Sequence, residues 1–515
     1  MKHLLWLALL LGSSPQDDAD LHLRSATIYD GSGKEGFTGD LAIRGDEIVA
    51  VGSWKGKAEK TIDAAGLVAA PGFIDLHTHS DGAIVAPASR ANRNFTHQGC
   101  TTIVTGNCGG GSVDVRKMFE TLDKEGAGTN VIHLLPHGSI RQQVFGSANR
   151  PPTAEELSKM KALAEKGMKD GAWGMSTGLV YIPGTYAETD EVVEMAKVVH
   201  RHGGIYASHI RSEAKSLQKS IREAIEIGER SGCPVHISHI KCSTREAWGQ
   251  MEETLGLIEA ARKRGLKVTA DQYPYIASST KLWSYTIPAW AMEGGDKKLV
   301  ERLDDPVQGK KIREAILENF EKRDGPGTSR IASYSKKNEW NGKTLARIAE
   351  EEGKDPVEIV IEVARNGGAQ AIGFSMREED MLQAMAKDYV ATASDGSARA
   401  PGGADVPHPR NYGTFPRKIG RYAVEKKAVP LTFAIRSASG LPADILGLKD
   451  RGYLKPGFKA DVVLFDPATF RDAATFDKPH QYATGVAWLW VNGQAVIADG
   501  EKTDALPGRA LRLNR

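Results

Sequence analysis

The sequence predicts an α/β protein whose central part is a (β/α)8 barrel of the TIM type. Short apolar runs alternate with amphipathic segments through the middle of the chain, a pattern typical of repeated βα units and a parallel sheet. Eight such runs are present, and eight parallel strands close a barrel of this kind. The runs occupy residues 73–76, 101–105, 131–135, 173–176, 205–208, 235–238, 267–270 and 389–394.

The two ends of the chain predict a second, smaller domain. Residues 21–68 form short alternating runs bounded by Gly and Asp, and similar runs return at 460–465 and 487–496. Neither end has enough strands to form a β-sandwich alone. We therefore expect residues 21–68 and 440–515 to build one β-sandwich domain, with the barrel at 69–439 inserted between them.

The barrel itself is expected to carry an insertion. The interval between the seventh and eighth runs is far longer than any other interval in the series. Long connections in a compact domain are usually lids or subdomains. We expect an inserted lid subdomain at about residues 288–342.

The composition favours a protein that binds small molecules. The chain has 515 residues, and its 67 Lys and Arg nearly balance its 65 Asp and Glu, leaving a net charge of +2. This balance argues against a nucleic-acid or membrane-surface partner. Hydrophobic residues make up 41% of the chain, which is enough to form a packed core. Four cysteines are too few for a disulfide framework in a chain of this length.

The N-terminus resembles a secretory signal. Lys2 and His3 precede an apolar run at 4–11, and small residues followed by acidic ones come after it. This run is too short to span a bilayer. We therefore expect residues 1–20 to be a signal peptide and the mature protein to be periplasmic or secreted. If the segment is not a signal, the protein is expected in the cytoplasm.

Residues able to bind a metal follow five of the eight runs. Paired histidines follow the first run, and a cysteine, two histidines and an aspartate follow the second, fifth, sixth and eighth. They are His77, His79, Cys108, His209, His239 and Asp395. The carboxyl ends of barrel strands meet at one mouth, so these side chains are expected to converge. A soft or borderline divalent metal suits such a set of ligands.

Each of these residues also has a structural interpretation. A histidine at a strand end is often only a hydrogen-bonded structural residue, and an aspartate before glycine, as at Asp395, is often a turn residue. Their joint occurrence at successive strand ends favours the metal site. His236, three residues before His239, is expected to face the other side of its strand and to be a core residue.

Longer motifs resemble a known family. Residues 71–81, PGFIDLHTHSD, resemble the opening motif of the amidohydrolase superfamily. Later motifs narrow the resemblance to the N-acyl-D-amino-acid deacylases, or D-aminoacylases: GNCG at 106–109, ASHIRSE at 207–213, ISHIK at 237–241, YPYIASS at 273–279, ASDG at 393–396 and HPRNYGTFPR at 408–417. The resemblance spans about residues 22–510. It implies a metal-dependent hydrolase of N-acyl-D-amino acids on a (β/α)8 barrel with a flanking β domain.

The resemblance also implies ligand roles. It places a tight zinc site on Cys108, His209 and His239, and a weaker second site on His77, His79 and Asp395. One catalytic zinc is implied, with the second site partly filled or empty. Asp395 would take a proton from water and pass it to the departing amine, as a general base that becomes a general acid.

Substrate-binding residues are implied in the same way. Lys241, Arg410 and either Tyr273 or Tyr275 match or lie beside the family's carboxylate-binding positions, and Met376 matches a pocket position. Members that act on acidic substrates use an additional arginine, whereas residues 277–295 contain none and are rich in aromatic residues. We therefore expect a small-molecule N-acyl-D-amino acid substrate with a neutral or apolar side chain, with Lys281 as the residue that could instead serve an acidic one.

Other functions fit parts of the pattern. A cyclic amidase such as a dihydropyrimidinase or hydantoinase usually has a carbamylated lysine at the end of strand four, where this chain has WGMSTG at 173–178. A D-dipeptidase would share the predicted chemistry. A thiol hydrolase would use Cys108 as its nucleophile, and a non-catalytic binding module would be expected to have lost some of the ligands.

Overall fold

A computed structural model describes residues 18–513 of the chain. Most of the predicted signal segment, residues 1–17, lies outside the described residues. Ala19 and Asp20, the end of that predicted segment, are instead the first residues of strand β1 (Ala19–Ile28), where Ala19 is buried and pairs with Ala58. No helix within residues 18–513 is long and apolar enough to cross a membrane.

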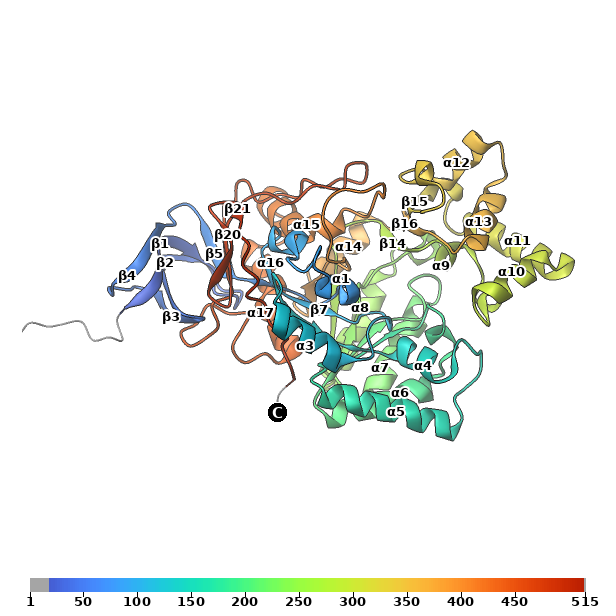
Figure 1. Cartoon of the computed structure of the whole chain (residues 1–515), viewed down its shortest axis with the longest axis horizontal. Helices are drawn as coiled ribbons and strands as arrows, with labels where there is room; N and C mark the ends of the chain where they lie inside the picture. The colour runs from blue at the N-terminus through green and yellow to red at the C-terminus, as the bar shows by residue number, and fades with distance from the viewer. Residues whose placement is uncertain (1–17, 514–515) are drawn as a thin grey trace, which may run out of the picture.

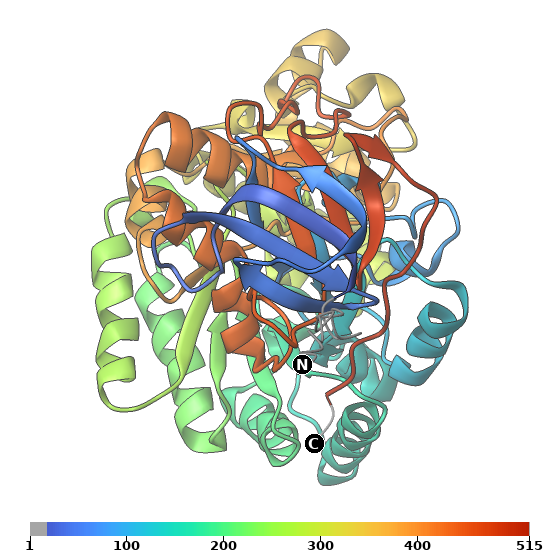
Figure 2. The ribbon, with the colours of Figure 1, turned by 90° about the vertical axis from the view of Figure 1, so that its left-hand side faces the viewer.

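Both ends of the chain contribute strands to one nine-stranded sheet. The N-terminal strands are β1, β2 (Phe37–Arg44), β3 (Glu47–Gly52), β4 (Ala58–Asp63) and β5 (Val68–Pro71). The C-terminal strands are β18 (Val462–Phe465), β19 (Val486–Val491), β20 (Gln494–Ala498) and β21 (Glu501–Lys502). Strands β5 and β18 join the two sets as an antiparallel pair, with Val68 opposite Phe465. Figure 2 shows the blue and red strands side by side.

The core of this sheet is also shared between the two ends. Its buried cluster combines Leu23 and Leu41 of the N-terminal strands with Val462, Leu464 and Trp490 of the C-terminal strands. Residues alternate along β1 between buried and more exposed, as expected for a strand with one face on a core. The predicted pairing of the two chain ends is therefore present in the structure, as one continuous hydrogen-bonded sheet.

The middle of the chain forms two parallel sheets. One has the order β6 (Phe73–Asp75), β7 (Cys100–Thr105), β8 (Asn130–His133). The other comprises β9 (Leu135–Pro136), β10 (Gly174–Gly178), β11 (Ile205–His209), β12 (Val235–Ile237), β13 (Val268–Gln272) and β17 (Val390–Thr392), each next to its neighbour in this order. Each of the eight predicted runs overlaps at least one of these strands.

The two parallel sheets meet at both edges. At one edge Leu134 donates its backbone N–H to Thr105, and Trp173 donates to His133, so pairing continues across the short break between β8 and β9. At the other edge Asp395 donates its backbone N–H to the carbonyl of His77 at 2.9 Å, and His79 donates to Gly396 at 2.7 Å. These last two bonds bring the ends of the first and last parallel strands together.

Amphipathic helices connect the parallel strands. Examples are α5 (Ala154–Lys169), α6 (Thr189–Arg201), α7 (Leu217–Ser231) and α8 (Met251–Lys263). In α7 the buried residues Leu217, Ile221, Ala224 and Ile225 recur at helical spacing. A helix with such a stripe buries it against the sheet and leaves its charged face in water.

A separate packed unit lies between β13 and β17. It contains the antiparallel sheet of β14 (Ser278–Lys281), β16 (Gln370–Gly373) and β15 (Ser329–Ser333), with helices α10 (Asp296–Asp304), α11 (Pro306–Glu321), α12 (Leu345–Glu352) and α13 (Pro356–Arg365). Its own hydrophobic cluster runs from Leu282 to Ala371. The unit extends beyond the expected 288–342 on both sides because β14 and β16 pair at its base. Figure 1 places its helices at the opposite end of the molecule from β1–β4.

Candidate metal centre

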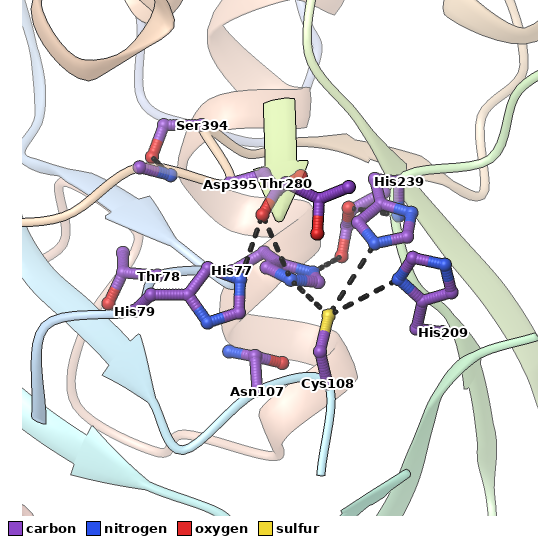
Figure 3. Close-up of polar contacts among 12 residues, drawn as sticks. His77, Thr78, His79, Asn107, Cys108, His209, His239, Thr280, Ser394 and Asp395 are labelled. Carbon is purple, nitrogen blue, oxygen red and sulfur yellow. Dashed lines mark hydrogen bonds and ion pairs between the residues drawn. The ribbon is translucent and has the colours of Figure 1, made fainter. Parts of the chain in front are cut away.

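The six predicted metal ligands converge at the carboxyl ends of the parallel strands (Figure 3). His77 and His79 follow β6, Cys108 follows β7, His209 ends β11, His239 follows β12 and Asp395 follows β17. All except His79 are buried. Residues from five distant parts of the sequence thus form one cluster.

Cys108 contacts three histidines of this cluster. Its Sγ lies 3.3 Å from His77 Nε2, 3.6 Å from His209 Nδ1 and 3.5 Å from His239 Nε2. Asp395 Oδ1 lies 2.9 Å from His79 Nε2 and 3.6 Å from His77 Nε2. The thiol and the carboxylate therefore both approach Nε2 of His77.

Three groups of potential ligand atoms lie within 4.8 Å of one another. They are His77, Cys108 and His239; His77, His79 and Asp395; and His209, Glu213 and His239. The second group is the predicted weaker site. The predicted tight set of Cys108, His209 and His239 is not one of the three compact groups, although Cys108 contacts both histidines. A thiolate, imidazoles and carboxylates are the donor types that zinc and similar divalent metals bind, so the residues present fit such an ion.

The loop that carries Cys108 is held in an unusual conformation. Cys108 has a φ of 53°, in the left-handed region, and Asn107 donates its side-chain amide to the carbonyls of Leu76 and Val104. The loop packs directly on the end of β10, where a Cβ on Gly178 would lie 2.2 Å from the carbonyl oxygen of Cys108. A side chain at position 178 would clash with this loop. The strand end therefore has no room there for the lysine that a cyclic amidase carries at the end of its fourth strand.

The environment of the Cys108 thiol argues against a nucleophilic role. Burial raises its pKa well above the ordinary value, and the nearby charge of Asp395 raises it further. Catalytic cysteines instead have a lowered pKa, which gives a reactive thiolate. Ligation to a cation is the ordinary way to hold a buried thiolate. The site therefore favours Cys108 as a metal ligand over Cys108 as a nucleophile.

Glu213 is a site residue that the sequence interpretation did not single out. Its Oε1 lies 2.9 Å from His239 Nδ1 and 2.5 Å from the Nζ of Lys241. Because the Nε2 of His239 faces Cys108, Glu213 occupies the outer nitrogen of the same ring. Its position in the ASHIRSE motif, four residues after His209, was the available signal. Lys241 is thus paired with a carboxylate and not free.

Asp395 is paired with a cation on its second oxygen. Arg410 Nη1 lies 2.8 Å from Asp395 Oδ2. Burial alone would raise the pKa of this carboxyl, but Arg410 and the neighbouring histidines outweigh it and hold the pKa well below the ordinary value. These neighbours therefore favour the ionised form of Asp395.

The structure separates the two candidate tyrosines. The Arg410 guanidinium carbon lies 4.8 Å from the ring centroid of Tyr273, and Lys241 Nζ lies 5.5 Å from the same centroid. Tyr275 instead packs against Arg417, 4.5 Å from its ring, and against Phe476. Met376 packs with both tyrosines. Tyr273 is therefore the tyrosine that lies beside the two predicted carboxylate-binding cations.

A cavity of about 1150 Å³ opens above the cluster. Its floor includes His79, Cys108, Asp395 and Arg410, and one wall is formed by the inserted unit. The wall residues include Thr280, Lys281, Trp283, Ile287 and Met292. Thr280 also donates a hydrogen bond of 3.0 Å to the hydroxyl of Tyr181, which links this wall to the loop after β10. The cavity is large enough for a small organic substrate.

Comparison with known proteins shows the family of the chain. A model of the amidohydrolase family matches residues 60–497. D-aminoacylase from Alcaligenes xylosoxydans xylosoxydans is 35% identical over 97% of this chain and 99% of its own length. A solved structure from work on the binuclear metal centre of D-aminoacylase superposes with a TM-score of 0.83 at 33% identity, covering 96% of this chain and all of that one.

A third relative has been solved in complex with ligands. The structure of N-acyl-D-glutamate deacylase from Bordetella bronchiseptica, in complex with zinc and a phosphonate inhibitor, superposes with a TM-score of 0.82. It is 32% identical and covers 96% of this chain and all of that one. The chain is therefore a metal-dependent member of the amidohydrolase family. Within it, the chain belongs with the N-acyl-D-amino-acid deacylases, the D-aminoacylase group.

Proposed function

We propose that this protein hydrolyses the amide bond of N-acyl-D-amino acids, releasing a carboxylate and a free D-amino acid. The observation that carries the proposal is the buried cluster of Cys108, the histidines and Asp395 on the floor of a cavity, with Arg410 beside it. The family membership and the names of the relatives support the same substrate class.

Zinc is the metal that we propose for this cluster. Cys108, His209 and His239 would hold it tightly, and His77, His79 and Asp395 would form a second, weaker site. Bound zinc lowers the pKa of water and polarises a carbonyl group, which is the chemistry that amide hydrolysis needs. The mixed thiolate and imidazole donors support zinc over magnesium or calcium, which prefer oxygen ligands.

The protein's own residues would move the proton and hold the substrate. Asp395, which is ionised and hydrogen-bonded to His79, would accept a proton from the attacking water and deliver it to the departing amine. Arg410, Lys241 and Tyr273 lie together on one side of the cluster and would bind the α-carboxylate. Met376 and Tyr275 would shape the pocket beneath it.

We further propose an architecture for this chemistry. The two parallel sheets would act as one (β/α)8 barrel at 69–439, since backbone hydrogen bonds join them at both edges. The nine-stranded sheet would be a β-sandwich domain at 21–68 and 440–515, and the inserted unit would be a lid. Export to the periplasm or the medium is proposed from the first 20 residues of the sequence alone.

The side chain of the preferred substrate is expected to be apolar. Trp283, Ile287 and Met292 line the cavity, and burying an unpaired carboxylate among such groups costs several kcal/mol. N-acetyl-D-leucine, -phenylalanine or -methionine should therefore exceed N-acetyl-D-glutamate in kcat/KM by more than about 10²-fold. A hydrolysis screen of N-acetyl-D-amino acids against their L-forms, with metal analysis of the same sample, tests both the activity and this order.

Lys281 provides the control for that screen. It lines the same cavity, and its Nζ lies 5.1 Å from the ring of Trp283, without an ion pair among residues 18–513. If glutamate is the best substrate, the apolar assignment is wrong, and Lys281→Met then shows whether this lysine is the cation responsible. Absence of hydrolysis with every D-substrate by the metal-loaded protein would refute the proposed function itself.

Arg410→Met is expected to impair every N-acyl-D-amino acid to a similar degree. The α-carboxylate is common to all these substrates, so KM should rise for all of them. Because Arg410 also pairs with Asp395, kcat should fall as well. Steady-state kinetics with three D-substrates measure both effects. A loss confined to one side chain would instead place Arg410 in the side-chain pocket.

A further inference from the structure

A buried carboxylate lies in a layer beneath the candidate ligands. Asp271, in β13, is fully buried. Its Oδ1 accepts a 2.7 Å hydrogen bond from the backbone N–H of His239. Its Oδ2 lies 2.8 Å from Nε2 of His236 and 3.4 Å from Nδ1 of His77. One carboxylate therefore reaches two candidate metal ligands.

His236 is part of this layer, which corrects the expectation from the sequence. It is buried, as expected of a core residue, but its ring is bonded to Asp271 at Nε2 and lies 2.9 Å from Thr269 Oγ1 at Nδ1. The alternation of strand faces does not separate it from His239, because β12 ends at Ile237 and His239 has a φ of 36°. Half-buried Thr269 and the buried His236 and Asp271 thus form a chain of polar contacts that ends at the cluster.

The contacts of Asp271 match what a metal ligand needs from its surroundings. His77 turns Nε2 toward Cys108 and Asp395, and Nδ1 toward Asp271. A carboxylate at the outer nitrogen of a histidine fixes the tautomer and the ring orientation, and it raises the basicity of the inner nitrogen. For His239 the contact is to the backbone, where it holds a left-handed conformation that is unfavourable for a residue with a side chain.

The charge of Asp271 has no ordinary counterion nearby. Within residues 18–513, no Lys or Arg side chain forms an ion pair with it, and its polar contacts are to histidines and a backbone N–H. Burying a carboxylate without a cation is costly. A metal ion held by His77 and the other candidate ligands would supply positive charge near this carboxylate.

We propose that Asp271, held in place by His236, is a positioning residue that orients His77 and His239 for metal binding. This inference rests on the proposed metal-dependent function. Asparagine at 271 would keep the shape, but it has a single acceptor oxygen. At least one of the three nitrogens around it, the backbone N of His239, Nε2 of His236 or Nδ1 of His77, would then face an amide NH2 group.

The test is the metal affinity of Asp271→Asn, measured separately from activity. Zinc should bind the variant about 10- to 100-fold more weakly than wild type in competition with a chromophoric chelator, the range typical of lost outer-layer partners of metal ligands. With cobalt in place of zinc, the absorption band from the Cys108 thiolate should persist at saturating metal, since Cys108 itself is intact. Unchanged zinc affinity would overturn the inference.

Asp461→Asn is the matched control. Asp461 is also a buried carboxylate with several donors, since it accepts hydrogen bonds from the backbone N–H of Asn492 and the side chains of Asn130 and Arg451. It lies outside the cluster. This variant should lower the melting temperature while leaving the zinc affinity unchanged. If Asp271→Asn and Asp461→Asn lose zinc affinity equally, Asp271 only stabilises the fold and does not orient the metal ligands.

Two variants of His236 test the chain of contacts without altering Asp271. His236→Gln retains an N–H donor and should keep most of the zinc affinity, whereas His236→Leu removes it and should weaken binding. Equal zinc affinity in the two variants would overturn the role of His236. This comparison still tests the inference if Asp271→Asn fails to fold. If the wild-type protein binds no zinc or cobalt, the proposed function fails rather than this inference alone.

Discussion

Replacing Cys108 with alanine is expected to remove the tightly bound metal and abolish hydrolysis together. Cys108 Sγ is the atom that lies within 3.6 Å of three histidine rings, so its loss removes the donor shared by His77, His209 and His239. Metal content by mass spectrometry and hydrolysis of an N-acetyl-D-amino acid should fall in the same sample. Wild-type protein should hold about one tightly bound zinc per chain.

Cys100→Ala is the control for this experiment. Cys100 is a second buried, free cysteine, in the strand that leads to the Cys108 loop, and it lies outside the cluster. The variant should keep its metal and its activity. Full zinc occupancy in Cys108→Ala would refute the ligand assignment, and hydrolysis that survives chelation of the metal would favour the thiol mechanism.

Changing Asp395 to asparagine is expected to lower kcat by roughly 10²-fold or more, the scale associated with loss of a general base. The two side chains have the same shape, and asparagine can still contact His79 and Arg410. The fold and the tight metal should therefore persist while proton transfer is lost. Stopped-flow or steady-state kinetics on protein of verified zinc content measure the effect.

Asp405→Asn is a matched substitution in the same cavity. Asp405 lines the cavity and pairs with Arg399, and it contacts none of the candidate ligands. Its replacement should change kcat little. A folded, zinc-containing Asp395→Asn protein with near-normal kcat would show that another group moves the proton.

The sequence predicts the positions of the candidate metal ligands because they lie at the regular ends of parallel strands. Parallel strands end at a common edge, so a histidine, cysteine or aspartate just after an apolar run can be placed near the others from the order of the residues alone. The same rule applies to Asp271, which directly follows the seventh run, but a single aspartate after such a run is more often a turn residue. Only its contacts with His236, His77 and His239 distinguish it.

The ion pairs between charged side chains of the site could not be predicted from the sequence. The pairing of Lys241 with Glu213 and of Arg410 with Asp395 depends on which rotamers fit among buried neighbours. Neither spacing nor composition fixes those rotamers. The tyrosine choice is similar, because Tyr273 and Tyr275 differ by two residues and only packing against Arg410 or Arg417 separates them.

The shared sheet of the two chain ends has a consequence for biosynthesis. Strand β5 finds its neighbour β18 only after the ribosome has made the whole of the intervening chain. Until then, the N-terminal strands present an unpaired edge, the feature by which nascent proteins associate with one another. Contacts this distant in sequence also form slowly. A chain that stops before β18 therefore leaves the edge of β5 that β18 covers open to other molecules.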